Sequence, residues 1–373
     1  MPLTAALAKT ATTPLTSLQR GQWIKLICGA SYQHLPVIRD LALVYTLAGV
    51  DCIDMAADAA VVSAVRRGVE AALSLTDTVP NGFHHRPWLM VSLNDGVDPH
   101  FRKAVLRPET CATNCSQPCV SVCPTAAVEP VLGQRPVEIF AERCYGCGRC
   151  LPICPAGVIV SESRQVGVDA IATQLLPHID AIEIHTQPGR QSEFDQLWRV
   201  LAPAAIKLKL VAVSCPDGPN HLSYLRQIYE ILRSSPTELL WQTDGRPMSG
   251  DIGAGTTHAA VRLAQTVLNA GLPGYVQLAG GTNAHTVTLL KRQGLLSLTS
   301  RIEDTAAAVV PSETRTVAGV AYGSYARRLV LDYLTETGSI EANVDRLTQA
   351  VQCAQSLVDP IRQGGDSGPD VLR

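Results

Sequence analysis

Eight of the 12 cysteines of this 373-residue chain lie within residues 111–154 and form two groups of four. The downstream group has the spacing C-x2-C-x2-C-x3-C-P, which is typical of a chain that wraps around a [4Fe–4S] cluster. The upstream group has three residues in each gap and also ends in Cys-Pro. Together the two groups predict a two-cluster module of the bacterial ferredoxin type and one-electron redox chemistry.

The fourth cysteine of each run in a two-cluster ferredoxin ligates the other cluster. We therefore expect two [4Fe–4S] clusters. Their ligand sets are Cys123, Cys144, Cys147 and Cys150 for one cluster, and Cys111, Cys115, Cys119 and Cys154 for the other. The longer gaps of the upstream group leave a [3Fe–4S] cluster as an alternative there.

Other uses of these cysteines fit the sequence less well. Disulfide frameworks are typical of small secreted chains, and residues 1–20 lack the continuous apolar core of a secretory signal. Structural zinc sites usually pair two separated cysteine knuckles. We therefore expect a reducing compartment and a cytoplasmic protein. A net charge of −2 gives no electrostatic case for nucleic-acid binding, and the apolar runs are shorter than the roughly 20 residues of a membrane span.

Outside the cysteine-rich stretch, short apolar runs alternate with amphipathic helical patterns, which favours parallel strands joined by helices. Eight strands are expected, at residues 23–28, 51–56, 88–93, 181–185, 206–213, 238–242, 275–278 and 316–321. This is the count of a (β/α)8 barrel. We predict an α/β fold in which a two-cluster ferredoxin-like α+β module is inserted after the third strand. Three separate pieces, α/β, ferredoxin and α/β, are the alternative.

The domain organisation follows from this element order. We expect a flexible N-terminus (1–20), a first barrel part (21–106), the two-cluster module (107–163), a second barrel part (164–340), and a C-terminal helix with a flexible tail (341–373). An insertion after the third strand leaves from the carboxyl-terminal rim, where barrel active sites lie.

Glycines follow the last two predicted strands. Gly280 and Gly281 come after the seventh strand, and Gly323 and Ser324 after the eighth. Barrels commonly bind phosphate in these two loops, because glycine lets backbone N–H groups approach the oxygens. We name these four residues as a candidate cofactor site, and a simple turn as the alternative.

Further polar residues and thiols mark the predicted rim. They are Cys28, Gly29, Ser31, Asp54, Asp58, Asn94, Asp95, His185, Cys215, Asp217, Asp244, Arg246 and Asn283. His185 is either a hydrogen-bonded rim residue or a proton donor, and Arg246 binds an anion or pairs with a nearby aspartate. Lys207 and Lys209 share one side of the predicted fifth strand, which marks either an exposed edge or a ligand site.

The combination of segments is more specific than any one motif. Trp23–Ala30 precedes the cysteine-rich stretch, and Trp241–Asp251 and Gly280–Asn283 follow it. This chain resembles the cyanobacterial light-dependent period protein family, the LdpA-type iron–sulfur proteins. The resemblance implies a cytoplasmic protein that senses cellular redox state and adjusts the circadian period to light. It also implies association with clock input proteins, and places the cluster ligands on the eight cysteines.

Two functions of different classes are therefore expected. The first is a redox sensor that exchanges electrons with redox carriers and is read by clock proteins. The second is an enzyme, a flavin-dependent barrel oxidoreductase fed with electrons by its ferredoxin module, with Lys207 or Lys209 facing the flavin. A sensor is the first choice, because no distinctive flavin signature occurs in the chain.

Overall fold

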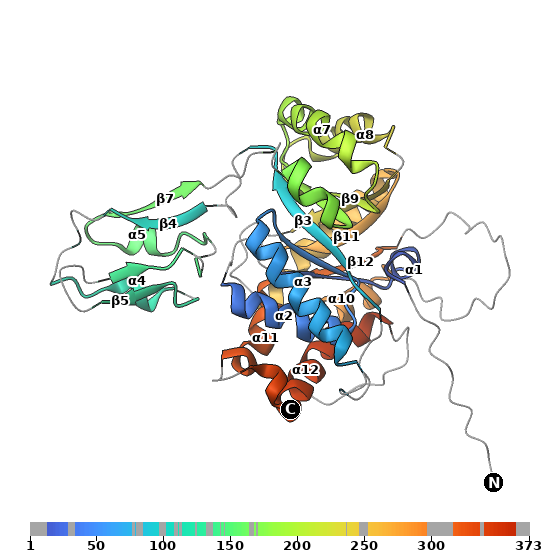
Figure 1. The fold of residues 1–373 in the computed structure, drawn as a ribbon. Helices are drawn as coiled ribbons and strands as arrows, with labels where there is room; N and C mark the ends of the chain where they lie inside the picture. The colour runs from blue at the N-terminus through green and yellow to red at the C-terminus, as the bar shows by residue number, and fades with distance from the viewer. Residues whose placement is uncertain are drawn as a thin grey trace, which may run out of the picture.

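The fold consists of a barrel and a smaller module beside it (Figure 1). The computed structural model describes residues 13–28, 34–76, 79, 85–96, 102–107, 111, 114–123, 125–131, 137–141, 143–144, 146–163, 168, 171–235, 237–245, 253–296, 316–335 and 339–362. The module is built from chain that lies between the third and fourth strands of the barrel. The predicted insertion point is thus confirmed.

Eight parallel strands form a closed barrel in the order β1-β12-β11-β10-β9-β8-β3-β2. β1 closes the barrel by pairing with β12, where Lys25 lies opposite Ala321. The strands are β1 (Trp23–Ile27), β2 (Cys52–Ala56), β3 (Trp88–Asn94), β8 (Ala181–His185), β9 (Leu210–Pro216), β10 (Glu238–Asp244), β11 (Tyr275–Ala279) and β12 (Gly319–Tyr322). The predicted barrel is confirmed, and the alternative of three separate pieces is wrong.

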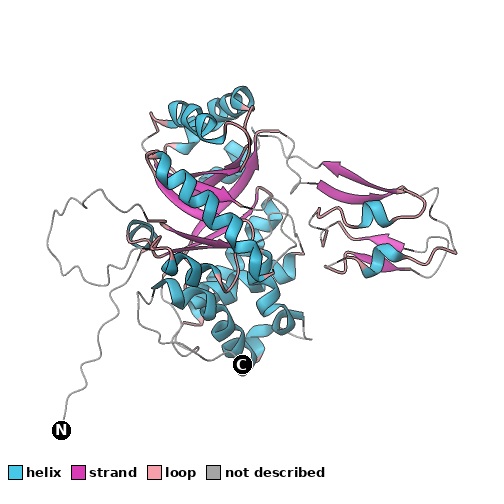
Figure 2. Cartoon of the chain, turned by 180° about the vertical axis from the view of Figure 1, so that it is seen from behind, coloured by secondary structure: helices cyan, strands magenta, loops and turns pink. Residues whose placement is uncertain are grey.

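Helices surround the barrel (Figure 2). The longer ones are α2 (Leu35–Ala48), α3 (Ala59–Ser74), α7 (Gln191–Ala205), α8 (His221–Leu232), α9 (Thr257–Ala270), α10 (Thr286–Arg292), α11 (Ser324–Thr335) and α12 (Val344–Arg362). A π-helical turn at Ile171–Leu175 and 3₁₀ turns at Leu176–His178, Ala254–Thr256 and Ile340–Ala342 complete the set. None of the helices in the described ranges is long and apolar enough to cross a membrane.

The close packing of α2 against α3 depends on a glycine. A Cβ at Gly68 of α3 would lie 2.1 Å from the carbonyl oxygen of Arg39 in α2. Only a residue without a side chain lets the two backbones approach so closely.

Apolar side chains fill the amino-terminal end of the barrel. The rings of Trp23 and Trp88 meet edge to face with centroids 5.5 Å apart. α1 (Pro14–Gln19) packs against this end through Leu18, which is 1% exposed. The prediction of a flexible N-terminus at 1–20 is therefore wrong for α1, because Leu18 belongs to the same apolar cluster as the two tryptophans. Residues 1–12 lie outside the described part of the chain, as do residues 363–373 of the predicted tail.

The inserted module has its own small core. β4 (Arg102–Leu106) pairs antiparallel with β7 (Ile159–Ser163), and β5 (Val128–Pro130) pairs antiparallel with β6 (Val137–Ile139). Two short helices, α4 (Pro118–Ser121) and α5 (Cys150–Ile153), carry cysteines. The apolar cluster of the module is distinct from those of the barrel and includes three of its cysteines as buried members.

The fifth barrel strand begins later than predicted. α7 continues to Ala205, and β9 starts at Leu210. Lys207 and Lys209 are exposed and precede β9, so they lie at the amino-terminal end of the barrel and not at its mouth. Lys209 pairs with Asp180 at 2.7 Å. The prediction of a strand at 206–209 is wrong, and so is a ligand-facing role for these lysines. The residues form a connecting loop in which Leu208 is buried between two exposed lysines, and this produces the alternating pattern.

Candidate functional site

Four cysteines surround one hollow in the inserted module. Cys123, Cys144, Cys147 and Cys150 line a hollow that is open to solvent. Cys123 follows α4, Cys150 begins α5, and the other two lie in the loop between β6 and α5. The first three cysteines of the downstream group and the last cysteine of the upstream group thus share a single hollow.

Backbone amides around this hollow point at sulfur. The N–H of Ala104 donates to Cys144 Sγ at 3.3 Å, and the N–H of Ala127 donates to Cys123 Sγ at 3.2 Å. Gly146 and Gly148 have φ values of 76° and 72°, a left-handed conformation that favours glycine. Such N–H groups stabilise thiolate sulfur and tune a bound cluster.

The thiols in the hollow oppose one another's ionisation. Burial and the nearby thiols of Cys144 and Cys147 raise the pKa of Cys150 to about 12. Three thiolates held so close together repel each other unless a cationic group lies between them. The donor set, the amides and the hollow therefore suit an iron–sulfur cluster.

The other four cysteines form a second neighbourhood. Burial and the thiols of Cys115 and Cys154 raise the pKa of Cys111. Burial raises the pKa of Cys119 as well, with contributions from Cys154, Cys115 and Cys111. For Cys154, burial acts to raise the pKa, but hydrogen bonds from the backbone at residues 156–159 outweigh it and lower the pKa. The last cysteine of the downstream run thus lies with the upstream three.

The longer upstream gap is accommodated by an unusual backbone conformation. Gln117, between Cys115 and Cys119, has φ 55° and ψ 46°, which is uncommon for a residue other than glycine. Its N–H donates to Cys115 Sγ at 3.4 Å. The backbone at Gln117 therefore turns another amide toward a cysteine sulfur.

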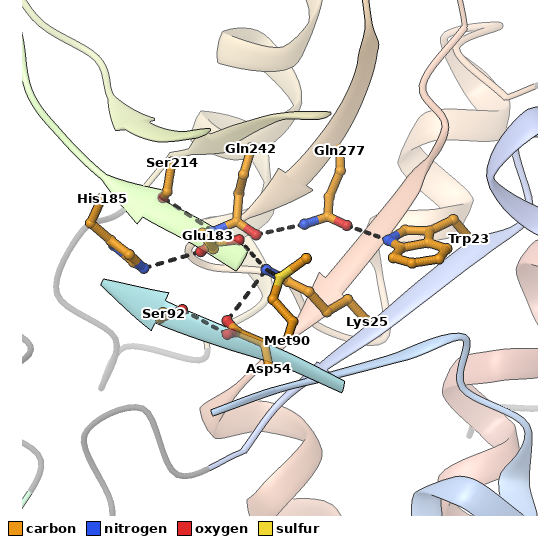
Figure 3. A network of polar contacts seen from close by, with 10 residues as sticks. All are labelled: Trp23, Lys25, Asp54, Met90, Ser92, Glu183, His185, Ser214, Gln242 and Gln277. Atoms are coloured by element: carbon orange, nitrogen blue, oxygen red, sulfur yellow. Dashed lines mark hydrogen bonds and ion pairs between the residues drawn. The ribbon is translucent and has the colours of Figure 1, made fainter. Parts of the chain in front are cut away.

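A second polar site occupies the interior of the barrel (Figure 3). Lys25 of β1 lies between Asp54 of β2 and Glu183 of β8, and all three side chains are at most 1% exposed. Lys25 Nζ is 3.4 Å from Asp54 Oδ2 and makes a closer contact with Glu183 Oε2. Ser92 donates to Asp54 Oδ1 at 2.6 Å.

Amide side chains extend the network across the barrel. Gln242 Nε2 donates to Glu183 Oε1 at 2.6 Å, and Gln277 Nε2 donates to Gln242 Oε1 at 2.5 Å. Trp23 Nε1 donates to Gln277 Oε1 at 2.6 Å (Figure 3). The chain of hydrogen bonds therefore ends at the apolar side chains that fill the amino-terminal end of the barrel. His185 Nε2 lies 3.0 Å from Glu183 Oε1 and is 17% exposed, which makes it the most exposed of the ionisable groups in this network.

Burial and pairing shift the pKa values of the three charged groups. Burial lowers the pKa of Lys25, but Asp54 and Glu183 outweigh this effect and raise it above its usual value. Burial raises the pKa of Asp54 to about 6, against the opposing effect of Lys25. For Glu183, Lys25 and His185 outweigh burial and lower the pKa. Lys25 therefore favours the ionised form of Glu183 more strongly than that of Asp54.

This interior network was not expected from the sequence. Asp54 and His185 were predicted at the rim, but Lys25, Glu183 and Gln242 were not singled out. One sequence signal could have indicated it: a charged or amide residue within an otherwise apolar strand. Lys25 in Trp23–Ile27 is an example. Lys207 and Lys209 show a similar alternation and lie outside any strand, so the signal needs the strand register to be useful.

The predicted glycine loops have structural partners. Gly280 and Gly281 follow β11 with φ 62° and 93°, and a Cβ at Gly281 would lie 2.9 Å from Thr256 O. Asn283 Nδ2 donates to Gly253 O at 2.9 Å. Gly323 lies between β12 and α11, and Ser324 is the first residue of α11. Close packing explains Gly281, and cofactor binding by these loops stays a prediction.

Several of the other predicted rim residues make hydrogen bonds to neighbouring parts of the barrel. Asp58 caps α3 by accepting from the N–H of Ala60 at 2.8 Å. Asp95 Oδ1 accepts from Arg190 Nε at 2.8 Å. The thiol of Cys28 is buried near Ile38 O at 3.6 Å. Gly29, Ser31 and Arg246 lie outside the described residues.

Comparison with known proteins assigns the chain to a family. Residues 111–165 match the LdpA Fe–S cluster-binding domain, and residues 175–360 match the light dependent period A C-terminal domain. The chain is 50% identical over 358 residues to Light dependent period A from Synechococcus elongatus, covering 95% of both chains. The chain belongs to the light dependent period A family. It is an iron–sulfur protein, and the resemblance found in its sequence is confirmed.

Solved structures show a weaker likeness. The tryptophan synthase α subunit from Legionella pneumophila is 10% identical with a TM-score of 0.41, covering 95% of this chain and all of the other. (S)-3-O-geranylgeranylglyceryl phosphate synthase from Thermoplasma acidophilum is 10% identical with a TM-score of 0.40, covering 94% and 97% of the two chains. We draw nothing on activity from these similarities.

The C-terminal domain of the LdpA family is only part of a barrel. The match at residues 175–360 contains β8 to β12. β12 pairs with β1, and β8 pairs with β3, and both partners lie outside that match. In this family member the barrel is therefore closed by residues upstream of the iron–sulfur module.

Proposed function

We propose that this protein is an iron–sulfur redox sensor that passes the redox state of the cell, and hence the light level, to the circadian clock. Family membership and the cluster-binding domain support the iron–sulfur part. The observation that carries the proposal is the grouping of eight cysteines into two sets whose sulfurs receive backbone N–H groups.

The proposed ligand sets follow the two neighbourhoods. One cluster binds to Cys123, Cys144, Cys147 and Cys150, and the other to Cys111, Cys115, Cys119 and Cys154. Both are [4Fe–4S] in this proposal, with [3Fe–4S] as the alternative at the second set. Reduction takes one electron from a reduced carrier protein and makes or breaks no covalent bond in the chain.

One proposed ligand contacts the barrel. Cys147 packs against the large apolar cluster that is otherwise formed by barrel strands and their helices. A change in cluster charge at this cysteine acts directly on that contact. Such a change can bias two states of a surface that a partner reads, and a clock input protein is the proposed partner.

The test is a comparison of two cysteine variants. Anaerobically purified wild type is expected to contain about eight irons and eight sulfides per chain, or about seven irons with one [3Fe–4S] cluster. Cys147→Ser is expected to lose one cluster signal in electron paramagnetic resonance and to abolish the light dependence of the period in cells. Cys353→Ser, in α12, is the matched control. Normal light-dependent periods in cells carrying Cys147→Ser would contradict the proposal.

A flavin-dependent enzyme is the alternative function, and it would be recognised by a bound flavin. Lys207 and Lys209 no longer support it, because they lie at the opposite end of the barrel. Acid precipitation separates the two functions: a stoichiometric flavin in the supernatant would favour the enzyme, and its absence the sensor.

A further inference from the structure

Lys103 is buried inside the iron–sulfur module, where lysine is rare. Its residue is 3% exposed, and its Nζ donates to the carbonyl oxygen of Cys144 at 2.6 Å. The next residue of β4, Ala104, donates its backbone N–H to Cys144 Sγ at 3.3 Å. Two consecutive residues of β4 therefore donate hydrogen bonds to Cys144, one to its carbonyl oxygen and one to its sulfur.

The position of Lys103 gives its charge a direct effect on that cysteine. Cys144 is 9% exposed and lines the hollow with the other three cysteines of its set. Charges interact more strongly in such an environment than in water. The reduction potential of an iron–sulfur centre depends on nearby charge and on hydrogen bonds to its ligands. A cation at this place favours the state with one additional electron.

We propose that Lys103 is a positioning residue that raises the reduction potential of the cluster held by Cys123, Cys144, Cys147 and Cys150. The inference rests on the proposed function, because it requires a cluster at these cysteines. The module takes up one electron from an external reductant, close to the side chain of Lys103. Its charge thus sets how reducing the cell must become before this half of the sensor responds.

The experiment is a potentiometric titration of the anaerobically purified full chain with dithionite and mediators, followed by electron paramagnetic resonance. In Lys103→Met we expect one of the two midpoint potentials to become more negative. The expected size is an approximately tenfold weaker reduction equilibrium, which is about 59 mV for one electron. The other midpoint is expected to stay at the wild-type value. Lys103→Arg retains the charge and should restore the first midpoint.

Arg102→Met is the matched control. Arg102 precedes Lys103 on β4 and is exposed, so this variant removes the same charge from the same strand on the solvent side. In this variant the equilibrium constant for reduction of either cluster is expected to change less than twofold, because exposed charges are screened.

Three outcomes would overturn the inference. An unchanged midpoint in Lys103→Met with full iron content would do so while leaving the proposed function intact. Loss of iron from both Lys103→Met and Lys103→Gln would show that the lysine holds the cluster and does not tune it. A wild-type chain with no reducible cluster would overturn the inference and the proposed function together.

Discussion

The guanidinium of Arg362, the last residue of α12, contacts both carboxylate oxygens of Asp51 at 3.1 Å. Asp51 immediately precedes β2 and is fully buried, and its Oδ2 also accepts from the N–H of Ile24 at 2.9 Å. The end of α12 is thereby joined to the residue that precedes β2 and, through it, to β1. α12 is part of the barrel structure for this reason, although its sequence looks like a peripheral helix.

Removing the arginine should destabilise the whole barrel. Arg362→Ala leaves a buried carboxylate without its main cation, and breaking such a pair costs about 3–5 kcal/mol. Urea unfolding followed by tryptophan fluorescence measures the loss. Arg233→Ala removes an exposed arginine that pairs with Glu230, and it should cost less than about 1 kcal/mol. Equal losses in the two variants would show that the contact with Asp51 does not stabilise the barrel.

Removing the interior lysine should destabilise the barrel by a similar amount. Lys25→Met leaves the carboxyl groups of Asp54 and Glu183 without a cation, and we expect a loss of about 3–5 kcal/mol in unfolding free energy. The double variant Lys25→Met/Glu183→Gln removes the ionised partner as well. It should recover part of the loss, because the two residues form one unit and their effects are not additive. Additive losses in the double-mutant cycle would disprove this coupling.

Asp54 should make stability depend on pH in an unusual direction. Its folded pKa, raised by burial to about 6, exceeds its ordinary value of 3.8, so the folded state binds the extra proton between these values. The unfolding free energy contributed by this group therefore falls as pH rises from about 4 to about 6. The total is on the order of 3 kcal/mol or less.

Asp54→Asn provides the comparison for that pH effect. The variant should lack this decrease, so the unfolding free energy of wild type minus that of the variant should fall as pH rises from about 4 to about 6 and then level off. Urea unfolding of both proteins at several pH values measures it. A difference that is constant from pH 4 to pH 8 would contradict the assignment.

The boundaries of the barrel can be tested by dissection. A fragment of residues 175–360 should not fold, because β8 and β12 lose β3 and β1 and expose unpaired edges. A chain in which a short Gly-Ser linker replaces residues 97–167 keeps all eight strands and should unfold cooperatively. Circular dichroism and thermal unfolding of the two proteins decide the matter. A folded, monomeric fragment would show that five strands suffice.

The sequence by itself determined the features that depend on local spacing. Cysteine spacing identified the iron–sulfur module, because the ligands of one loop are set by a few consecutive residues. Alternation of apolar strands and helices predicted the barrel and the insertion point, since hydrophobic period reflects secondary structure directly. Six of the eight strands were predicted within two residues of their observed bounds. The strand predicted at 316–321 begins three residues later, at Gly319, and the one predicted at 206–213 begins four residues later, because a helix end followed by a loop imitated its alternation.

Only the tertiary structure decided which residues meet inside the fold. Lys25, Asp54 and Glu183 come from β1, β2 and β8, and they converge because strand register turns each of them to the inner face. A shift of one residue in any strand would turn its side chain outward, and the local sequence does not specify that register. The contacts of Arg362 with Asp51 and of Lys103 with Cys144 join residues far apart in the chain. Which residues meet in these contacts depends on how whole helices and strands pack together, and a short sequence pattern does not predict that packing.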